Sequence, residues 1–267
     1  MASGGMSPSS IPPLGEYLTA LPSVSWDPLK LPANYSLTPG AQARVRTDLR
    51  HFYQDPPVGI VVSPVPDQFG KLYAAISGPP DTPYEGGFFI FYIAFSQDYP
   101  LSPPRVRLLT TGNGSVRFGP NLYANGKVCL SILGTWSGPQ WTPTQSLTSV
   151  LLSIQSLMSE EPYYNEPGYE NHINQIASKN YNETIKHETL RCAVCDVVER
   201  LVKYPDDIYD IIKVTFLEQY NDYIDTCDNN SSKDGSPMHG HNHVLQASRF
   251  QYQHIKTRLE ALKAQLS

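Results

Sequence analysis

The stretch Gly87-Phe88-Phe89-Ile90-Phe91-Tyr92-Ile93-Ala94-Phe95-Ser96 contains eight consecutive hydrophobic residues, from 88 to 95. Successive side chains of a β-strand point to opposite faces of the sheet. The two faces would be Phe89, Phe91, Ile93 and Phe95 on one side and Phe88, Ile90, Tyr92 and Ala94 on the other. Because both faces are apolar, the stretch predicts a central strand that is covered on both sides.

Three further strands are predicted near this one, at Gly59–Val62, Lys71–Ser77 and Arg105–Leu109. Each is rich in β-branched or aromatic residues and is separated from the next by turn residues. The spacers are short, which favours an antiparallel meander because parallel strands need long crossovers.

Helices are predicted on both sides of the strands. A first one is indicated by Val45, Leu49 and Phe52, which share one helical face. A second begins at residues 142–145, where Thr142-Pro143-Thr144-Gln145 has the pattern of a capping box. A third covers residues 180–201 and has one apolar stripe, formed by Leu190, Val194, Val197 and Leu201. Strands grouped between helices predict the α+β class.

The segment from 110 to 141 shows no regular period, because glycines interrupt it repeatedly. It still carries apolar residues, such as Phe118, Leu122 and Val128, so we expect an ordered loop. A long irregular segment inside a compact domain is usually functional or disordered. The apolar content therefore favours a functional loop here.

The two ends of the chain differ from the middle. Residues 1–38 are rich in proline and serine, which predicts an extended or disordered arm. Its apolar residues are expected to dock onto the folded part; they are Tyr17, Leu18, Leu21, Trp26 and Leu29. Residues 39–203 are predicted to form the core domain. Residues 204–267 are predicted to be a helical C-terminal extension with a flexible loop at about 228–243. It contains two amphipathic segments, one marked by Ile208, Ile211, Ile212 and Phe216 and the other by Ile255, Leu259, Leu262 and Leu266.

The composition excludes several classes of protein. The chain has 267 residues and a net charge of -5, which argues against a general nucleic-acid or membrane binder. It contains no apolar run long enough to cross a bilayer and no signal peptide at its start. We therefore expect a cytoplasmic or nuclear protein whose four cysteines are reduced thiols.

Several motifs occur in a fixed order along the core. They are SGPPDTPYEGGF at 77–88, DYPLSPPRV at 98–106, Pro120-Asn121 followed by Cys129-Leu130, and Trp141-Thr142-Pro143. Together they resemble the ubiquitin-conjugating enzyme family, over about residues 39–201. The segment NGKVCLSILGTW at 125–136 is most similar to the Z-type members of that family.

The resemblance implies the ubiquitin-conjugating fold and its activity. The enzyme would accept ubiquitin, or a ubiquitin-like modifier, as a thioester on Cys129 and pass it to a substrate lysine or to a ligase. A thiolate suits this role because it is both a strong nucleophile and a good leaving group. The expected partners are ubiquitin or a ubiquitin-like modifier, an activating enzyme, ligases and substrate proteins. The Z-type likeness implies the divergent second activating enzyme. No cofactor is expected, since the activating enzyme uses the ATP.

The resemblance also suggests roles for two residues near Cys129. Asn121 would stabilise the oxyanion that forms when a lysine attacks the thioester, or it would brace the loop as a turn residue. Glu166 would orient the incoming lysine, or it is a solvated loop acid. Tyr163, Tyr164 and Asn165 are alternative residues for that pocket.

Seven residues match positions that meet partners in the family. We define them as the partner surface and expect Arg44, Arg46 and Arg50 to be solvated on their helix. The set is Arg44, Arg46, Arg50, Leu101, Pro103, Trp141 and Pro143.

One departure from the family concerns the triplet before the catalytic segment. The family usually has His-Pro-Asn, but this chain has Gly119-Pro120-Asn121. Because the histidine is regarded as a structural support, we expect other contacts to order the loop.

Three alternatives compete with this prediction. A catalytically impaired, ubiquitin-binding variant would lack the cysteine, but Cys129 is present. A docking module in the C-terminal region is compatible with catalysis. A papain-like hydrolase would need a histidine base, and no histidine lies in the catalytic segment. Cys192-x-x-Cys195 has no second pair and falls in a predicted helix, which favours ordinary thiols over a zinc or redox site. The segment His239-Gly240-His241-Asn242-His243 has the residue type of a metal site, but it lies in a polar loop without obvious further ligands, which favours a flexible linker.

Overall fold

The computed structural model describes residues 26–32, 35–169, 174–238 and 249–267. Its four strands are β1 (Ile60–Pro64), β2 (Lys71–Ser77), β3 (Phe88–Ala94) and β4 (Arg105–Leu108). They pair antiparallel in the order β1-β2-β3-β4. The predicted meander and the α+β class are confirmed, and each predicted strand lies within two residues of its observed bounds.

β3 is buried at all seven positions. Phe89, Phe91 and Ile93 belong to a core formed with α2 (Pro39–Gln54) and α3 (Leu147–Gln155). Phe88 and Ile90 belong to a second core on the opposite face. The prediction that this strand is covered on both sides is therefore confirmed.

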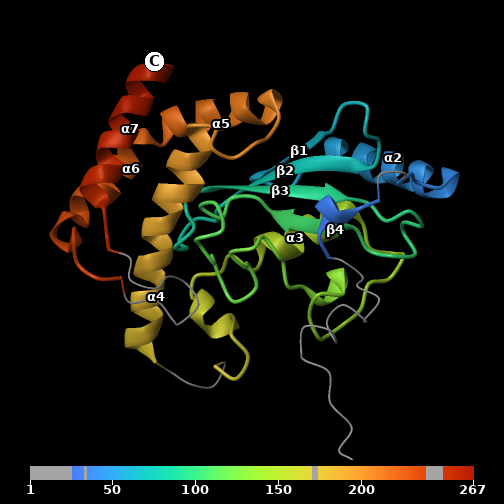
Figure 1. Cartoon of the computed structure of the whole chain (residues 1–267), viewed down its shortest axis with the longest axis horizontal. Coiled ribbons are helices and arrows are strands. Elements are labelled where there is room, and N and C mark those ends of the chain that lie inside the picture. The colour runs from blue at the N-terminus through green and yellow to red at the C-terminus, as the bar shows by residue number, and fades with distance from the viewer. Residues whose placement is uncertain (1–25, 33–34, 170–173, 239–248) are drawn as a thin grey trace, which may run out of the picture.

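The second core is built from the later part of the chain. Its helices are η4 (Thr189–Asp196), α5 (Asp206–Glu218), α6 (Tyr220–Asn229) and α7 (Tyr252–Leu266). Figure 1 shows α6 and α7 beside the long helix that α4 (Gln175–Glu188) and η4 form together. Gly87 permits η4 to come this close, because a Cβ atom there would lie 2.6 Å from the Thr189 Cγ2 atom.

Short 3-10 segments complete the described chain. They are η1 (Pro28–Lys30), η2 (Ser131–Leu133), η3 (Pro162–Asn165) and η5 (Ser231–Lys233). η1 is fixed by Asp27, whose carboxylate forms an ion pair of 2.7 Å with Arg107 of β4. Leu29, which we expected to dock onto the core, is 62% exposed instead. Most of the predicted N-terminal arm lies outside the described residues.

The start of α3 corrects one prediction. Ser146 is the N-cap and forms a capping box with Ser149, so the box at Thr142–Gln145 is not the helix cap. Those residues form a turn, in which the Gln145 side chain accepts a hydrogen bond from the Thr142 backbone N–H at 3.1 Å. This turn contains one of the two hydrogen bonds of a capping box, which explains the wrong prediction.

The helix predicted over 180–201 also differs. It starts earlier, at Gln175, and changes at Thr189 from α-helical to π-helical geometry. Leu201, which we placed on the buried stripe, lies beyond the helix and is 70% exposed. Leu190, Val194 and Val197 of the same stripe are buried as predicted, so the error at Leu201 arises because the helix ends at Val198.

The C-terminal extension contains a helix that the sequence did not reveal. α6 covers Tyr220–Asn229 and buries only Tyr223 and Cys227, which is too sparse a stripe to detect. The loop expected at about 228–243 therefore begins after Asn229, and residues 239–243 lie outside the described part. On α5, Ile208, Ile212 and Phe216 are buried as expected, but Ile211 is 47% exposed.

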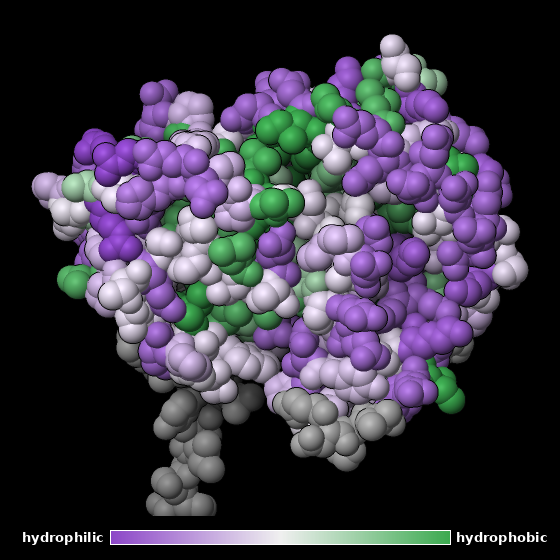
Figure 2. Space-filling model, turned by 180° about the vertical axis from the view of Figure 1, so that it is seen from behind, coloured by the Kyte–Doolittle hydropathy of each residue, from purple (hydrophilic) through white to green (hydrophobic). Residues whose placement is uncertain are grey.

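The surface of the molecule is mixed. On the face turned away in Figure 1, hydrophobic residues form a broken band between hydrophilic areas (Figure 2). Such exposure is ordinary, since apolar atoms supply more than half of a folded protein's accessible surface. In the described part of the chain, no helix is both long and apolar enough to span a bilayer.

Because α7 closes the second core, we expect Leu259→Ala to destabilise the protein strongly. Leu259 is 0% exposed, and removing a buried leucine costs about 2–5 kcal/mol. Leu201→Ala is the matched control, since that leucine is 70% exposed and should change stability by less than about 0.5 kcal/mol. Urea unfolding of both variants measures the difference, and equal small effects would mean that α7 does not stabilise the core.

Candidate active site

The catalytic segment is a tight hairpin held against the edge of the sheet. Leu122 pairs with Val128, and the Tyr123 backbone N–H donates to the Lys127 carbonyl at 3.0 Å. Gly126 makes the turn with a positive φ of 87°, and its carbonyl accepts from the Leu108 N–H of β4 at 2.9 Å. A Cβ atom at Gly126 would lie 2.5 Å from the Leu108 carbonyl oxygen, so only glycine allows this approach.

Cys129 and Asn121 are joined by two hydrogen bonds across this hairpin. The Cys129 backbone N–H donates to the Asn121 carbonyl at 2.9 Å, and the Asn121 Nδ2 donates to the Cys129 carbonyl at 2.9 Å. Asn121 is buried. The structure thus brings the two predicted residues together and gives Asn121 the bracing role. The side-chain amide of Asn121 has a second N–H, which is a donor for an oxyanion.

Thr135 holds the other side of the cysteine and was not foreseen. Its hydroxyl accepts from the Leu130 N–H at 2.9 Å and donates to the Val128 carbonyl at 2.6 Å. These two residues flank Cys129. A lone threonine six residues after a cysteine gives no sequence signal, so only the fold could reveal this contact.

The loop at Gly119 is ordered by two residues that sequence reasoning also missed. Arg117 is buried and donates from Nε to the Gly119 carbonyl at 3.0 Å and from Nη2 to the Pro120 carbonyl at 2.7 Å. The Tyr84 hydroxyl donates to the Phe118 carbonyl. The expectation that other contacts replace the histidine is therefore confirmed.

Cys129 is only 1% exposed. This burial raises its pKa, while the charge of Lys127, a hydrogen bond from the Tyr123 hydroxyl and the charge of Arg117 lower it. Burial raises the pKa of Cys195 and of Cys227 to about 12. The pKa of Cys129 is therefore raised overall, although the charges of Lys127 and Arg117 offset part of the effect of burial.

Glu166 lies at the edge of the site. Its carboxylate is 3.5 Å from the Arg117 Nη2 and its side chain is 33% exposed. Of the alternative pocket residues, Tyr163 is buried against the rings of Tyr164, Tyr169 and Tyr181. Asn165 donates to the Leu157 carbonyl at 3.2 Å. Glu166 is thus linked to the catalytic loop, whereas Tyr163 and Asn165 make structural contacts.

The partner surface is held together by a buried carboxylate. Asp48 of α2 forms an ion pair with Arg44 at 2.7 Å and accepts hydrogen bonds from the Leu147 N–H and the Tyr99 hydroxyl. Arg44 also donates to the Pro143 carbonyl at 2.8 Å. The prediction that Arg44 is solvated is therefore wrong: it ties α2 to the loop before α3.

The remaining members of the partner surface differ in exposure. Arg46 and Arg50 are exposed, as predicted, and so is Pro143. Leu101 is 72% exposed and is the most exposed large hydrophobic side chain of the partner surface. Trp141 is half-buried, and its Nε1 donates to the Pro100 carbonyl at 2.7 Å. The two loops are thus joined directly.

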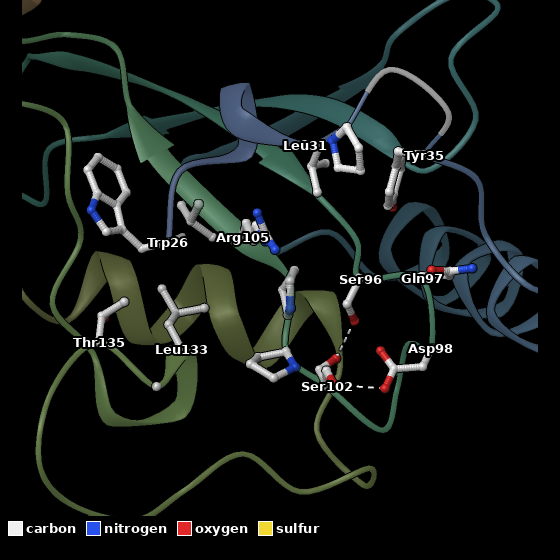
Figure 3. A pocket seen from close by; sticks show the side chains of 15 residues that line it. Trp26, Leu31, Tyr35, Ser96, Gln97, Asp98, Ser102, Arg105, Leu133 and Thr135 are labelled. Carbon is white, nitrogen blue, oxygen red and sulfur yellow. Dashed lines mark hydrogen bonds between the residues drawn. The ribbon is translucent and has the colours of Figure 1, made fainter. Parts of the chain in front are cut away.

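Pro103 lines a cavity of about 370 Å³ beside the active site. Figure 3 shows this cavity between the N-terminal segment with Trp26 and the segment with Leu133 and Thr135. Ser102 donates to the Asp98 carboxylate at 2.8 Å at its rim. Cys129 is not among the lining residues, so the cavity adjoins the catalytic loop without containing the nucleophile.

The other candidate ligand residues lie away from this site. Cys192 and Cys195 are buried in η4. Within the described ranges, no group of three or more histidines, cysteines or acids is placed to hold a metal ion. His239, His241 and His243 fall outside those ranges.

Comparison with known proteins identifies the class that this fold and site define. A family model described as ubiquitin-conjugating enzyme matches residues 44–191. The chain belongs to the ubiquitin-conjugating enzyme family, and it is a transferase of the type that carries ubiquitin as a thioester. Its partners accordingly include ubiquitin, an activating enzyme and ligases.

Similar proteins show which members of the family the chain resembles. Ubiquitin-conjugating enzyme E2 Z of Danio rerio is 46% identical over 261 residues, covering 97% of this chain and 79% of that protein. Ubiquitin-conjugating enzyme E2 Z of Xenopus tropicalis is 49% identical over 223 residues, covering 82% and 70%. The Homo sapiens dual E2 ubiquitin-conjugating enzyme/E3 ubiquitin-protein ligase BIRC6 is 50% identical over 132 residues, covering 46% and 3%. The predicted likeness to Z-type enzymes is confirmed.

We expect Tyr123→Phe to raise the pKa of Cys129, because it removes the hydroxyl whose interaction with the thiol lowers that pKa and keeps the ring. Less thiolate is then present at neutral pH, and alkylation by iodoacetamide should slow there and recover at higher pH. Tyr209→Phe is the matched control, since that ring also lies under an arginine, at 4.7 Å from Arg200. An unchanged pH profile of alkylation would contradict this effect of the Tyr123 hydroxyl on the thiol.

Proposed function

We propose that Cys129 carries the thioester and that Asn121 and Glu166 serve the transfer to lysine. The observation that supports this most directly is the pair of reciprocal hydrogen bonds between Cys129 and Asn121. They fix the backbone on either side of the thiol, so the acyl group of a bound modifier would form next to the Asn121 amide. Preorganised donors of this kind stabilise the oxyanion of acyl transfer.

The reaction has two steps. In charging, the Cys129 thiolate attacks the carbonyl of the activating enzyme's thioester, a new sulfur–carbon bond forms, and the activating enzyme's thiolate leaves. In discharge, the neutral lysine amine attacks the new thioester, Cys129 leaves as a thiolate, and the amine loses its proton. The Glu166 carboxylate, 33% exposed beside the loop, is suited to orient that amine.

The partners and setting follow from the same assignment. We propose that the chain accepts ubiquitin or a ubiquitin-like modifier from the divergent second activating enzyme, as the Z-type likeness implies. Arg46, Arg50, Leu101, Trp141 and Pro143 would contact the activating enzyme and ligases. The enzyme would work without a bound cofactor, because ATP is used upstream, and without nucleic acid or membrane. Four free cysteines support a reducing compartment, the cytoplasm or the nucleus.

A charging assay tests the carrier residue. The protein, ATP, an activating enzyme and ubiquitin should give an adduct that reductant removes. Cys129→Ser should give a reductant-stable ester or no adduct, because an oxygen ester resists thiols. Cys227→Ala is the matched control, since Cys227 is also buried, and it should keep the adduct. Loss of Cys129 without loss of the adduct would refute the assignment, and no adduct with any activating enzyme would favour the catalytically impaired variant.

Asn121→Ala should slow discharge to free lysine more than it slows charging. Both steps form an oxyanion, but attack by an amine is the more demanding one. Losing one oxyanion donor costs about 3 kcal/mol, or roughly 100-fold in rate. Asn125→Ala is the control, because Asn125 also braces this hairpin, accepting from the Lys127 N–H at 3.0 Å. Equal and small effects on both steps would leave Asn121 with the bracing role alone.

A further inference from the structure

Arg117 lies beneath the catalytic loop and contacts the residues that lead into Asn121. Its Nε donates to the Gly119 carbonyl at 3.0 Å and its Nη2 to the Pro120 carbonyl at 2.7 Å. These carbonyls belong to the two peptide units immediately before Asn121. One planar guanidinium thus fixes the backbone that carries the proposed oxyanion donor.

The same guanidinium reaches the other side of the nucleophile. Its centre lies 4.2 Å from the centroid of the Tyr123 ring, and the hydroxyl of that ring lowers the pKa of the Cys129 thiol. Its Nη2 is 3.5 Å from the Glu166 carboxylate. The Arg117 side chain, which is 9% exposed, therefore contacts Tyr123, Glu166 and the backbone just before Asn121.

A side chain at the position that usually carries histidine in the family would make a tight contact here. A Cβ atom on Gly119 would lie 3.2 Å from the Tyr84 hydroxyl oxygen. That hydroxyl is already engaged with the Phe118 carbonyl, and Tyr84 is fully buried. Support from a side chain at 119 is thus replaced by support from residue 117.

We propose that Arg117 is a positioning residue for discharge, which holds Asn121 and Tyr123 in register with Cys129 in place of a histidine at 119. The proposal rests on the proposed roles of Cys129 and Asn121. Arg117 does not touch the reacting atoms. It acts by fixing the geometry of groups that do, and small displacements of such groups are costly.

Arg117→Lys is the informative variant, because it keeps the charge near the thiol but loses the planar fork. We expect charging within about twofold of the wild type. Discharge at saturating lysine should fall by about 10- to 100-fold, with the half-saturating lysine concentration unchanged. Arg200→Lys is the matched control and should discharge normally. Arg200 also donates to a carbonyl (Tyr204), pairs with a carboxylate (Asp206) and lies over a tyrosine ring, at 5.0 Å from Tyr204.

A double-mutant cycle separates positioning from general support. If Arg117 acts through Asn121, the double variant Arg117→Lys, Asn121→Ala should discharge about as slowly as Asn121→Ala alone. Circular dichroism and thermal melting establish that each variant is folded. If Arg117→Lys does not fold, Arg117→Gln replaces it in the same cycle, since it leaves no buried charge and keeps one amide donor.

Two outcomes would overturn the proposal while leaving the proposed function intact. One is discharge of folded Arg117→Lys within about twofold of the wild type. The other is a double variant whose loss equals the product of the two single losses, which would make the residues independent. If the wild type forms no thioester on Cys129, the proposed function fails and the proposal fails with it.

Discussion

A strand that is apolar on both faces has to be covered on both faces, and β3 imposes this condition on the whole molecule. Phe89, Phe91 and Ile93 are covered by α2 and α3, which also anchor the loops of the partner surface. Phe88 and Ile90 are covered by helices from the C-terminal third of the chain. Burial of this apolar area is the main favourable contribution to folding. The extension is therefore structurally continuous with the sheet that supports the catalytic loop.

The same sheet explains where the chemistry lies. The catalytic hairpin is fastened to β4 through the Leu108 and Gly126 backbones, and β4 is fastened to β3 by its strand register. Asp48 performs a related task on the partner surface, because it joins α2, α3 and the loop at Tyr99. Both arrangements rely on buried hydrogen bonds. Such networks hold one geometry because every member is satisfied.

Most of the correct predictions came from local patterns in the sequence. The alternation in β3 predicted the sheet and its double cover, and the spacing between Asn121 and Cys129 predicted a pair that the fold does bring together. The errors arose where a residue's partner is distant in sequence. Arg44 has the pattern of a solvated helical arginine but binds the Pro143 carbonyl, and Arg117 gives no signal until the loop is folded over it. The end of the helix before Leu201 and the sparse stripe of α6 give no signal in a 3.6-residue period.

The near-complete burial of Cys129 has a consequence for the enzyme between reaction cycles. Oxidation of cysteine by peroxides proceeds through the thiolate and requires access to the sulfur. Cys129 is 1% exposed and its pKa is raised by burial, so it meets neither condition well. The idle enzyme would therefore keep its proposed nucleophile in a form that resists conversion to sulfenic and sulfinic acids. The contacts that make the thiol difficult to reach also preserve it chemically until an activating enzyme engages the loop.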